Sequence, residues 1–154
     1  MSIATVPGEP KLLFPVLRPF YEVVEPLSWP LIRAAVGAIF LIHGIGHIPP
    51  DNFAKWSASL VTRGYFPAPE FAYFLVFIET VGAACVVLGL FTRFFASAIA
   101  IELGVMAMFE FGPNGFNWNN KGYEYALMWG LVFLAIALRG GGPYSLDRRL
   151  GKEL

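Results

Sequence analysis

Four long apolar segments, separated by short polar ones, dominate the chain. They cover residues 29–48, 71–91, 94–111 and 123–138. A helix that crosses the hydrocarbon core of a bilayer needs about 20 mostly apolar residues. The pattern therefore predicts an all-α fold, an integral membrane four-helix bundle in which the last helix is the shortest.

The segment between the first two apolar runs, residues 49–69, is too polar to cross a membrane. Asp51 or Asn52 can cap a short helix there, and Gly64 can end it. The apolar side chains of such a helix fall on one side. They are Phe53, Trp56, Leu60 and Val61. This predicts a short interfacial helix between helices 1 and 2, lying across one mouth of the bundle.

The chain divides into three parts by composition. Residues 1–28 lack the uninterrupted apolar stretch of a cleavable signal, and their prolines are expected to deny a long helix. We interpret them as a cytoplasmic or interfacial arm on the membrane surface, with docking to a partner subunit as the alternative. Residues 29–140 form the transmembrane domain, and residues 141–154 form a cytoplasmic tail.

The charge balance excludes some partners and orients the bundle. Eleven basic and eleven acidic residues give a net charge of +0, which provides no field to attract nucleic acid. Basic residues gather on the side that holds both termini, which predicts cytoplasmic termini in a bacterial inner membrane. Those residues are Lys11, Arg18, Arg33, Arg93, Arg139, Arg148, Arg149 and Lys152. We expect Arg33 and Arg93 to extend to the head groups.

Acidic and imidazole side chains interrupt the apolar runs. A carboxylate in mid-membrane costs roughly 2.5–3.5 kcal/mol on insertion scales, so it indicates a functional site. Glu79 and Glu102 fall near the bilayer centre of neighbouring helices. His43 and His47 stand one turn apart in the outer half of helix 1. Glu110 and Glu124 lie near the outer surface, so the six groups are expected to form a column from the midplane outward.

Such a cluster suits a quinone, whose head group needs hydrogen bonds to two carbonyls and a supply of protons. Glu79, Glu102 and His43 are the candidate catalytic residues, while His43, His47, Glu110 and Glu124 are candidates for binding the cofactor. A zinc or iron site on two histidines and a carboxylate is the alternative, although no metal ligand set is assigned. A haem between the histidines is excluded because both leave one face of one helix.

The sequence carries no motif for flavin, nicotinamide or an iron–sulfur cluster, so a second protein would have to supply electrons. The lone Cys85 excludes an internal disulfide.

Several short motifs in order resemble the DoxX family of small four-helix membrane proteins, over roughly residues 29–150. They comprise Arg33, Gly37, His43 and Gly44; Glu79 and Gly82; Leu88, Gly89, Leu90, Thr92 and Arg93; Asn119, Lys121, Gly122 and Glu124; and the tail 140–147. The family includes the membrane subunit of a thiosulfate:quinone oxidoreductase. The resemblance implies a quinone-linked redox or accessory role. The N-terminal arm and His47 depart from the family pattern.

The sequence thus predicts a DoxX-like membrane subunit of a redox complex that binds quinone or relays protons at an intramembrane Glu/His site. A non-catalytic accessory subunit that anchors or stabilises a larger assembly is the main alternative, and a proton or small-solute conduit is a third. The expected partners are membrane lipids and either other membrane-protein subunits or further copies of the chain.

Overall fold

The computed structural model describes residues 12–153, in which every regular element is helical and no strand occurs. The α-helices are α1 Arg18–His47, α2 Pro50–Thr62, α3 Ala68–Phe77, α4 Ala83–Leu88, α5 Thr92–Val105, α6 Glu124–Arg139 and α7 Leu146–Leu150. A π-helical turn, Ile78–Gly82, joins α3 to α4, and a second one, Met106–Glu110, extends α5. Short 3-10 turns occupy Pro15–Leu17, Gly112–Asn114 and Trp118–Asn120.

Three helical stretches within the described residues are long and apolar enough to cross a membrane. They are Pro15–His47, Ala68–Leu88 and Thr92–Glu110. The fourth predicted span is α6, which has 16 residues and packs along α5. The prediction of an all-α membrane bundle with a short helix between the first two spans is confirmed.

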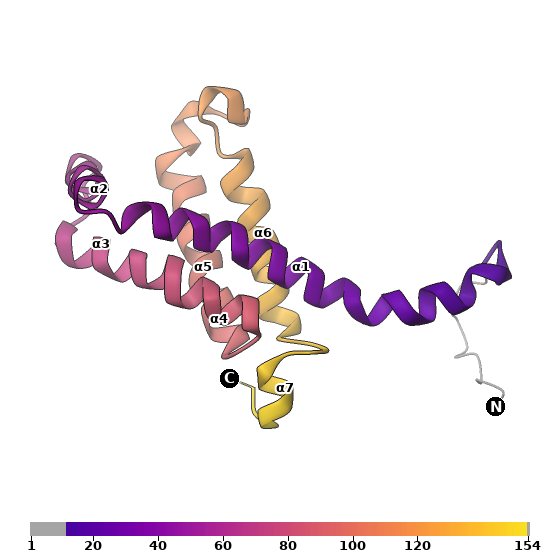
Figure 1. Ribbon diagram of the computed structural model, residues 1–154. Coiled ribbons are helices and arrows are strands. Elements are labelled where there is room, and N and C mark those ends of the chain that lie inside the picture. Colours follow the sequence, from indigo (N-terminus) through magenta and orange to yellow (C-terminus); the bar gives the residue numbers. More distant parts are fainter. Residues whose placement is uncertain (1–11, 154) are drawn as a thin grey trace.

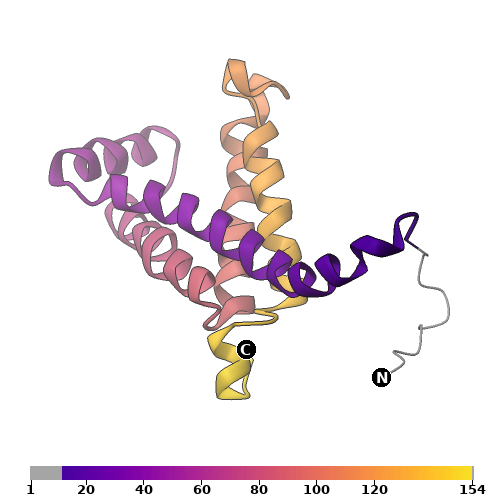
Figure 2. The same ribbon diagram turned by 45° about the vertical axis from the view of Figure 1, so that its right-hand side comes forward.

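The helices form two pairs. Figures 1 and 2 show α1 running beside α3 and α4, and α5 running beside α6. The two pairs meet near α7 and diverge toward α2. We call these the α7 end and the α2 end of the bundle.

Two glycines let α1 pack closely on the second span. A Cβ added to Gly37 would lie 2.8 Å from Val87 Cγ2, and one added to Gly44 would lie 2.7 Å from the backbone carbon of Glu79. Small residues commonly permit such close approach between membrane helices. Gly44 therefore holds α1 directly against the π-helical turn that carries Glu79.

Helix α2 lies at the end of the bundle where the two helix pairs diverge, as the sequence pattern predicts. Leu60 is buried, and Phe53 and Trp56 pack with it against α3. Val61, expected on the same side, is 60% exposed and lies outside this cluster. Gly64 adopts a φ of +84°, which few other residues accept, and follows the end of the helix as predicted.

Helix α1 contradicts the expectation that the prolines of the arm prevent a long helix. It is continuous from Arg18 to His47 and includes Pro26 and Pro30. Each proline removes only one backbone hydrogen bond, and their spacing of four places both on one face. The helix therefore changes direction instead of ending (Figure 1). All side chains from 12 to 23 are exposed.

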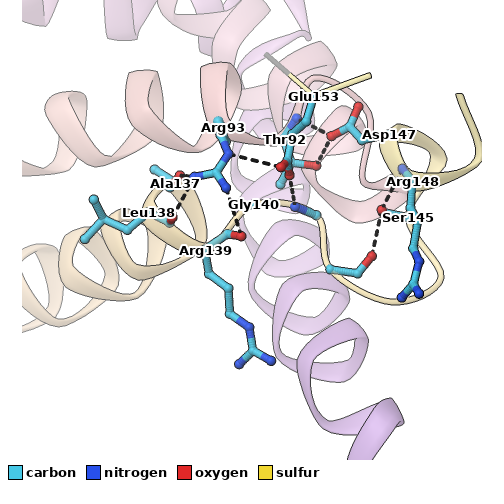
Figure 3. Close-up of polar contacts among 12 residues, drawn as sticks. Thr92, Arg93, Ala137, Leu138, Arg139, Gly140, Ser145, Asp147, Arg148 and Glu153 are labelled. Carbon is cyan, nitrogen blue, oxygen red and sulfur yellow. Dashed lines mark hydrogen bonds and ion pairs between the residues drawn. The ribbon is translucent and has the colours of Figure 1, made fainter. Parts of the chain in front are cut away.

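Polar contacts tie the helix ends together at the α7 end (Figure 3). The Asp147 carboxylate accepts hydrogen bonds from the backbone N–H of Phe91 and of Thr92 and from the Thr92 hydroxyl, at 2.7, 3.0 and 2.7 Å. Asp147 lies in the first turn of α7 but closes the start of α5. Ser145 accepts a bond from the Arg148 N–H and so caps α7 itself.

The predicted extension of Arg33 and Arg93 to the head groups is wrong for Arg33, which is 3% exposed. Its Nη1 donates to the Val86 and Val87 carbonyls in the last turn of α4. Arg93, in turn, donates to the carbonyls of residues 137–139 at the end of α6. The last carbonyls of a helix lack partners within it, which explains why both guanidinium groups donate to them.

Candidate functional site

A cavity of about 700 Å³ lies between the two helix pairs, where they diverge. Helices α1, α2, α3, α5 and α6 and both π-helical turns line it. Its wall is mostly aromatic and aliphatic, with polar groups at a few points. Those polar groups are His43, His47, Arg63, Glu79, Glu102 and Glu110, with Tyr65 and Tyr125. A largely apolar wall with few polar groups and this volume are typical of a small-molecule site.

Glu79 and Glu102 adjoin one another at the wall of this cavity. Glu79 lies in the π-helical turn Ile78–Gly82 and is 6% exposed, while Glu102 comes from α5. The Oε2 atom of each carboxyl group is buried, and a hydrogen bond between the two groups requires a proton that they share. The structure therefore brings the two central carboxyl groups together, as the sequence predicted.

The histidines of α1 reach the same cavity. His47 Nε2 lies 3.7 Å from Glu79 Oε2. The His47 ring stacks on Trp56 of α2, with 4.2 Å between ring centroids. His43 lines the cavity one turn closer to the middle of the span. Imidazole and carboxyl groups from three helices thus face one space.

An ion pair bridges the two helix pairs at the α2 end. Arg63, which follows α2, contacts Glu110 in the π-helical turn Met106–Glu110. Their side chains are 40% and 14% exposed. Both residues line the cavity, so this pair forms part of its outer wall.

Glu124 does not join the others. It begins α6, and its carboxylate accepts a hydrogen bond of 3.2 Å from the Trp118 N–H in the preceding loop. Glu124 is absent from the cavity wall, whereas its neighbours Tyr125 and Ala126 are present. The column expected from the sequence therefore contains five of the six predicted groups.

Sequence reasoning did not select Arg63, Trp56 or Trp129, which also line the cavity. For Arg63 and Trp56, the sequence does contain a signal in the spacing of residues. Trp56, Leu60 and Arg63 are spaced by four and three residues, which places them on one helical face. No comparable signal marks Trp129, because its exposure to the cavity depends on how α6 packs.

The polar side chains of the cavity do not form a cluster suited to a metal ion in the part of the chain that the structure describes. Within residues 12–153, no group of three or more His, Cys, Asp or Glu side chains is arranged to hold a metal ion. The carboxyl pair, the imidazoles and the aromatic wall instead offer hydrogen bonds and stacking surfaces to a small molecule.

Comparisons with known proteins agree with this architecture. The DoxX family model matches residues 28–111, more than half of the chain. That stretch contains His43, His47, Arg63 and the three glutamates of the cavity. A protein of Haemophilus influenzae described as uncharacterized is 27% identical over 135 residues, which cover 86% of this chain and 97% of that protein. No solved structure matches the chain.

Proposed function

The chain belongs to the DoxX family of membrane proteins, and we propose that it is the membrane subunit of a redox complex that binds a quinone in this cavity. One observation supports the proposal most strongly. Two adjoining, buried carboxyl groups lie in mid-span at the wall of an apolar cavity. Such groups are rare inside membranes and commonly mark substrate or proton pathways.

Each polar residue then has a role. Glu79 and Glu102 hold a proton between them, because two charged carboxylates cannot stay close together in a water-poor interior. They orient the head group, while His43 donates a hydrogen bond to it. The bound quinone supplies the electron-accepting chemistry. A second protein subunit brings the electrons to this site.

Protons would move between this site and the outer surface. His47 lies beside Glu79, and the Arg63–Glu110 pair lies farther toward the α2 end. These groups make a route along one side of the cavity. Glu124 has no part in it, since its carboxylate holds the Trp118 N–H.

The proposal includes an orientation in a bacterial inner membrane, with both termini in the cytoplasm. The α7 end carries Arg139, Arg148, Arg149 and Lys152, whereas the α2 end carries Lys55, Arg63 and Lys121. This imbalance supports cytoplasmic termini.

The first test measures quinone-dependent turnover in membranes that contain the complex. Glu79→Gln and His43→Ala should each lower turnover by about tenfold or more, the equivalent of losing one charge-assisted hydrogen bond. Glu70→Gln is the matched control, because Glu70 is exposed on the same span and absent from the cavity wall. Unchanged turnover in both site variants, at equal protein levels, would reject the proposal.

The exposed side chains of the N-terminal arm favour a second function, that of a non-catalytic accessory subunit. Side chains 12–23 are exposed and include the apolar Leu13, Val16 and Phe20. If a partner subunit covers this surface, it should no longer copurify with the chain when residues 1–23 are deleted. Copurification lost on deletion, together with turnover that tolerates Glu79→Gln, would favour this function over quinone binding.

A further inference from the structure

His47 is the basic side chain that lies against the carboxyl pair, Glu79 and Glu102. Within residues 12–153, no other Lys, Arg or His side chain is in ion-pair contact with either carboxyl group. Its Nε2 lies 3.7 Å from Glu79 Oε2. A hydrogen bond between these two atoms requires them to approach by roughly another 0.5–1 Å. A small rotation of the imidazole ring therefore decides whether the two groups can exchange a proton.

Trp56 is the side chain that limits this rotation. Its indole ring stacks on the His47 imidazole, with 4.2 Å between ring centroids and 18° between ring planes. Stacked aromatic rings gain about 0.5–1.5 kcal/mol beyond their burial, so turning the imidazole out of this orientation is unfavourable. The His47 side chain is 29% exposed. Without the stacking partner, the ring would have room to turn away from Glu79.

Helix α2 places Trp56 beside His47 through contacts on either side of the indole. Asn52 Nδ2 donates a hydrogen bond of 2.9 Å to the Gly46 carbonyl in the last turn of α1. Leu60 is buried in the cluster that α2 forms with α3, and Trp56 packs against this cluster. The position of the indole ring is thus set by both helices of the first pair.

The carboxyl pair needs a proton donor once it has given up its shared proton to a bound ligand. Two negative charges then lie together in a water-poor interior, which is costly. A proton carried by His47 Nε2 is the nearest replacement. We propose that Trp56 is a positioning residue, which holds His47 so that its Nε2 returns a proton to Glu79. The inference rests on the quinone site proposed above and adds a residue of α2 to its proton supply.

Nitrogen NMR tests the positioning without any ligand. The chain has only two histidines, so isotope-labelled histidine gives few signals from the full chain in nanodiscs, and the spectrum of His47→Gln identifies the His47 Nε2 resonance. Glu79→Gln should shift this resonance, because it removes the carboxyl group nearest to Nε2. In a Trp56→Leu background, the shift caused by Glu79→Gln should be lost, because the ring no longer faces Glu79.

Two further variants separate positioning from general packing. Trp56→Phe keeps a ring that can stack on His47, so it should preserve the shift. Phe53→Leu is the matched control, because Phe53 belongs to the same cluster of α2 and α3 but lies against Tyr73 and outside the cavity wall. It weakens the packing of α2 and removes no ring stacked on His47, so it should also preserve the shift. Circular dichroism establishes that every variant is folded.

Turnover in membranes that contain the complex tests the proton step. Trp56→Leu should lower kcat by about tenfold and leave the KM for the quinone unchanged, because it slows a proton transfer and removes no contact to the ligand. The solvent deuterium isotope effect on kcat should increase. In a His47→Ala background, Trp56→Leu should have no further effect on kcat, because the two residues act as a unit.

The outcomes separate this inference from the proposed function. A full Glu79→Gln shift in the absence of Trp56, or a shift that Phe53→Leu abolishes as well, overturns the inference. A loss of kcat in Trp56→Leu that adds to that of His47→Ala also overturns it. The expected NMR shifts in a complex that shows no quinone-dependent turnover would support the positioning of His47 and overturn the quinone site.

Discussion

Single charged side chains close the ends of helices to which they do not belong. Asp147 accepts the free N–H groups at the start of α5, and Arg33 donates to the free carbonyls at the end of α4. Arg33 and Asp147 are both buried, so water cannot replace these bonds. These residues therefore stabilise the α7 end, where the two helix pairs meet.

Replacing Asp147 tests this at the residue scale. Asp147→Asn keeps one acceptor oxygen and loses the charge, so we expect the free energy of unfolding to fall by about 1–3 kcal/mol. Thermal unfolding in detergent, followed by circular dichroism, measures the change. Asp51→Asn, on the exposed first turn of α2, is the control. Equal melting temperatures for the two variants would contradict the capping role of Asp147.

Among the elements, the two π-helical turns are the most unusual. Ile78–Gly82 carries Glu79, and Met106–Glu110 carries Glu110. A π-helical turn widens the helix and changes the direction of the side chains that follow, and such turns are frequent at functional sites. Gly44 packs directly on the first of them. The position of Glu79 thus depends on close contact between α1 and this turn.

Gly44→Ala tests the contact between these elements. The added Cβ would lie 2.7 Å from three backbone and side-chain atoms of Glu79, so α1 must move away. Overpacking of this kind costs about 1–3 kcal/mol of stability, and the displaced Glu79 should also weaken ligand binding. Thermal unfolding measures the loss of stability, and calorimetric titration with a benzoquinone measures the loss of ligand binding.

Gly46→Ala provides the matched control on the same helix, because a Cβ there meets no atom within 4 Å. It should leave binding unchanged and stability equal or higher by up to about 1 kcal/mol, because Ala favours a helix over Gly. If Gly44→Ala behaves like Gly46→Ala, the close packing of α1 against Glu79 does not matter.

The whole molecule is a bundle joined firmly at one end and opened at the other. The α7 end, where the two helix pairs meet (Figure 2), is tied by buried polar contacts. The α2 end has the cavity between the helix pairs. The Arg63–Glu110 ion pair crosses this opening. We therefore expect α2 to be the part of the wall that opens most easily.

Breaking the ion pair should increase that opening. Arg63→Glu places two acidic groups together, while the exchange Arg63→Glu with Glu110→Arg restores the attraction. A partly exposed pair contributes at most about 1 kcal/mol, so amide hydrogen exchange in α2 should accelerate by roughly fivefold or less. Exchange rates that the double variant fails to restore would show that the pair does not hold α2.

The orientation of the whole chain can be measured by labelling. Cys85 is the only cysteine, so Cys85→Ser gives a cysteine-free background. In that background we expect Lys55→Cys to react with a membrane-impermeant maleimide in intact cells. Lys152→Cys should react only after the cells are permeabilised. The reverse pattern would contradict cytoplasmic termini.

The sequence by itself determined the class of protein and the approximate spans. Hydropathy depends on residues that follow one another, so the apolar runs, the interfacial helix and the mid-span depth of Glu79 and Glu102 could be read directly. The helical period also placed His43 and His47 on one face. All these properties depend on residues that lie close together in the sequence, so they do not depend on which helices pack against one another.

Only the tertiary structure decided which faces meet. The pairing of Glu79 with Glu102, the approach of Arg63 to Glu110 and the absence of Glu124 from the cavity depend on how the helix pairs cross and rotate. The π-helical turns shift side-chain directions that a constant helical period cannot predict. The ends of the helices likewise bind residues far away in the sequence. At the start of α5, the Thr92 N–H donates to Asp147, which is more than 50 residues away. Contacts between distant segments follow from packing, which no local pattern records.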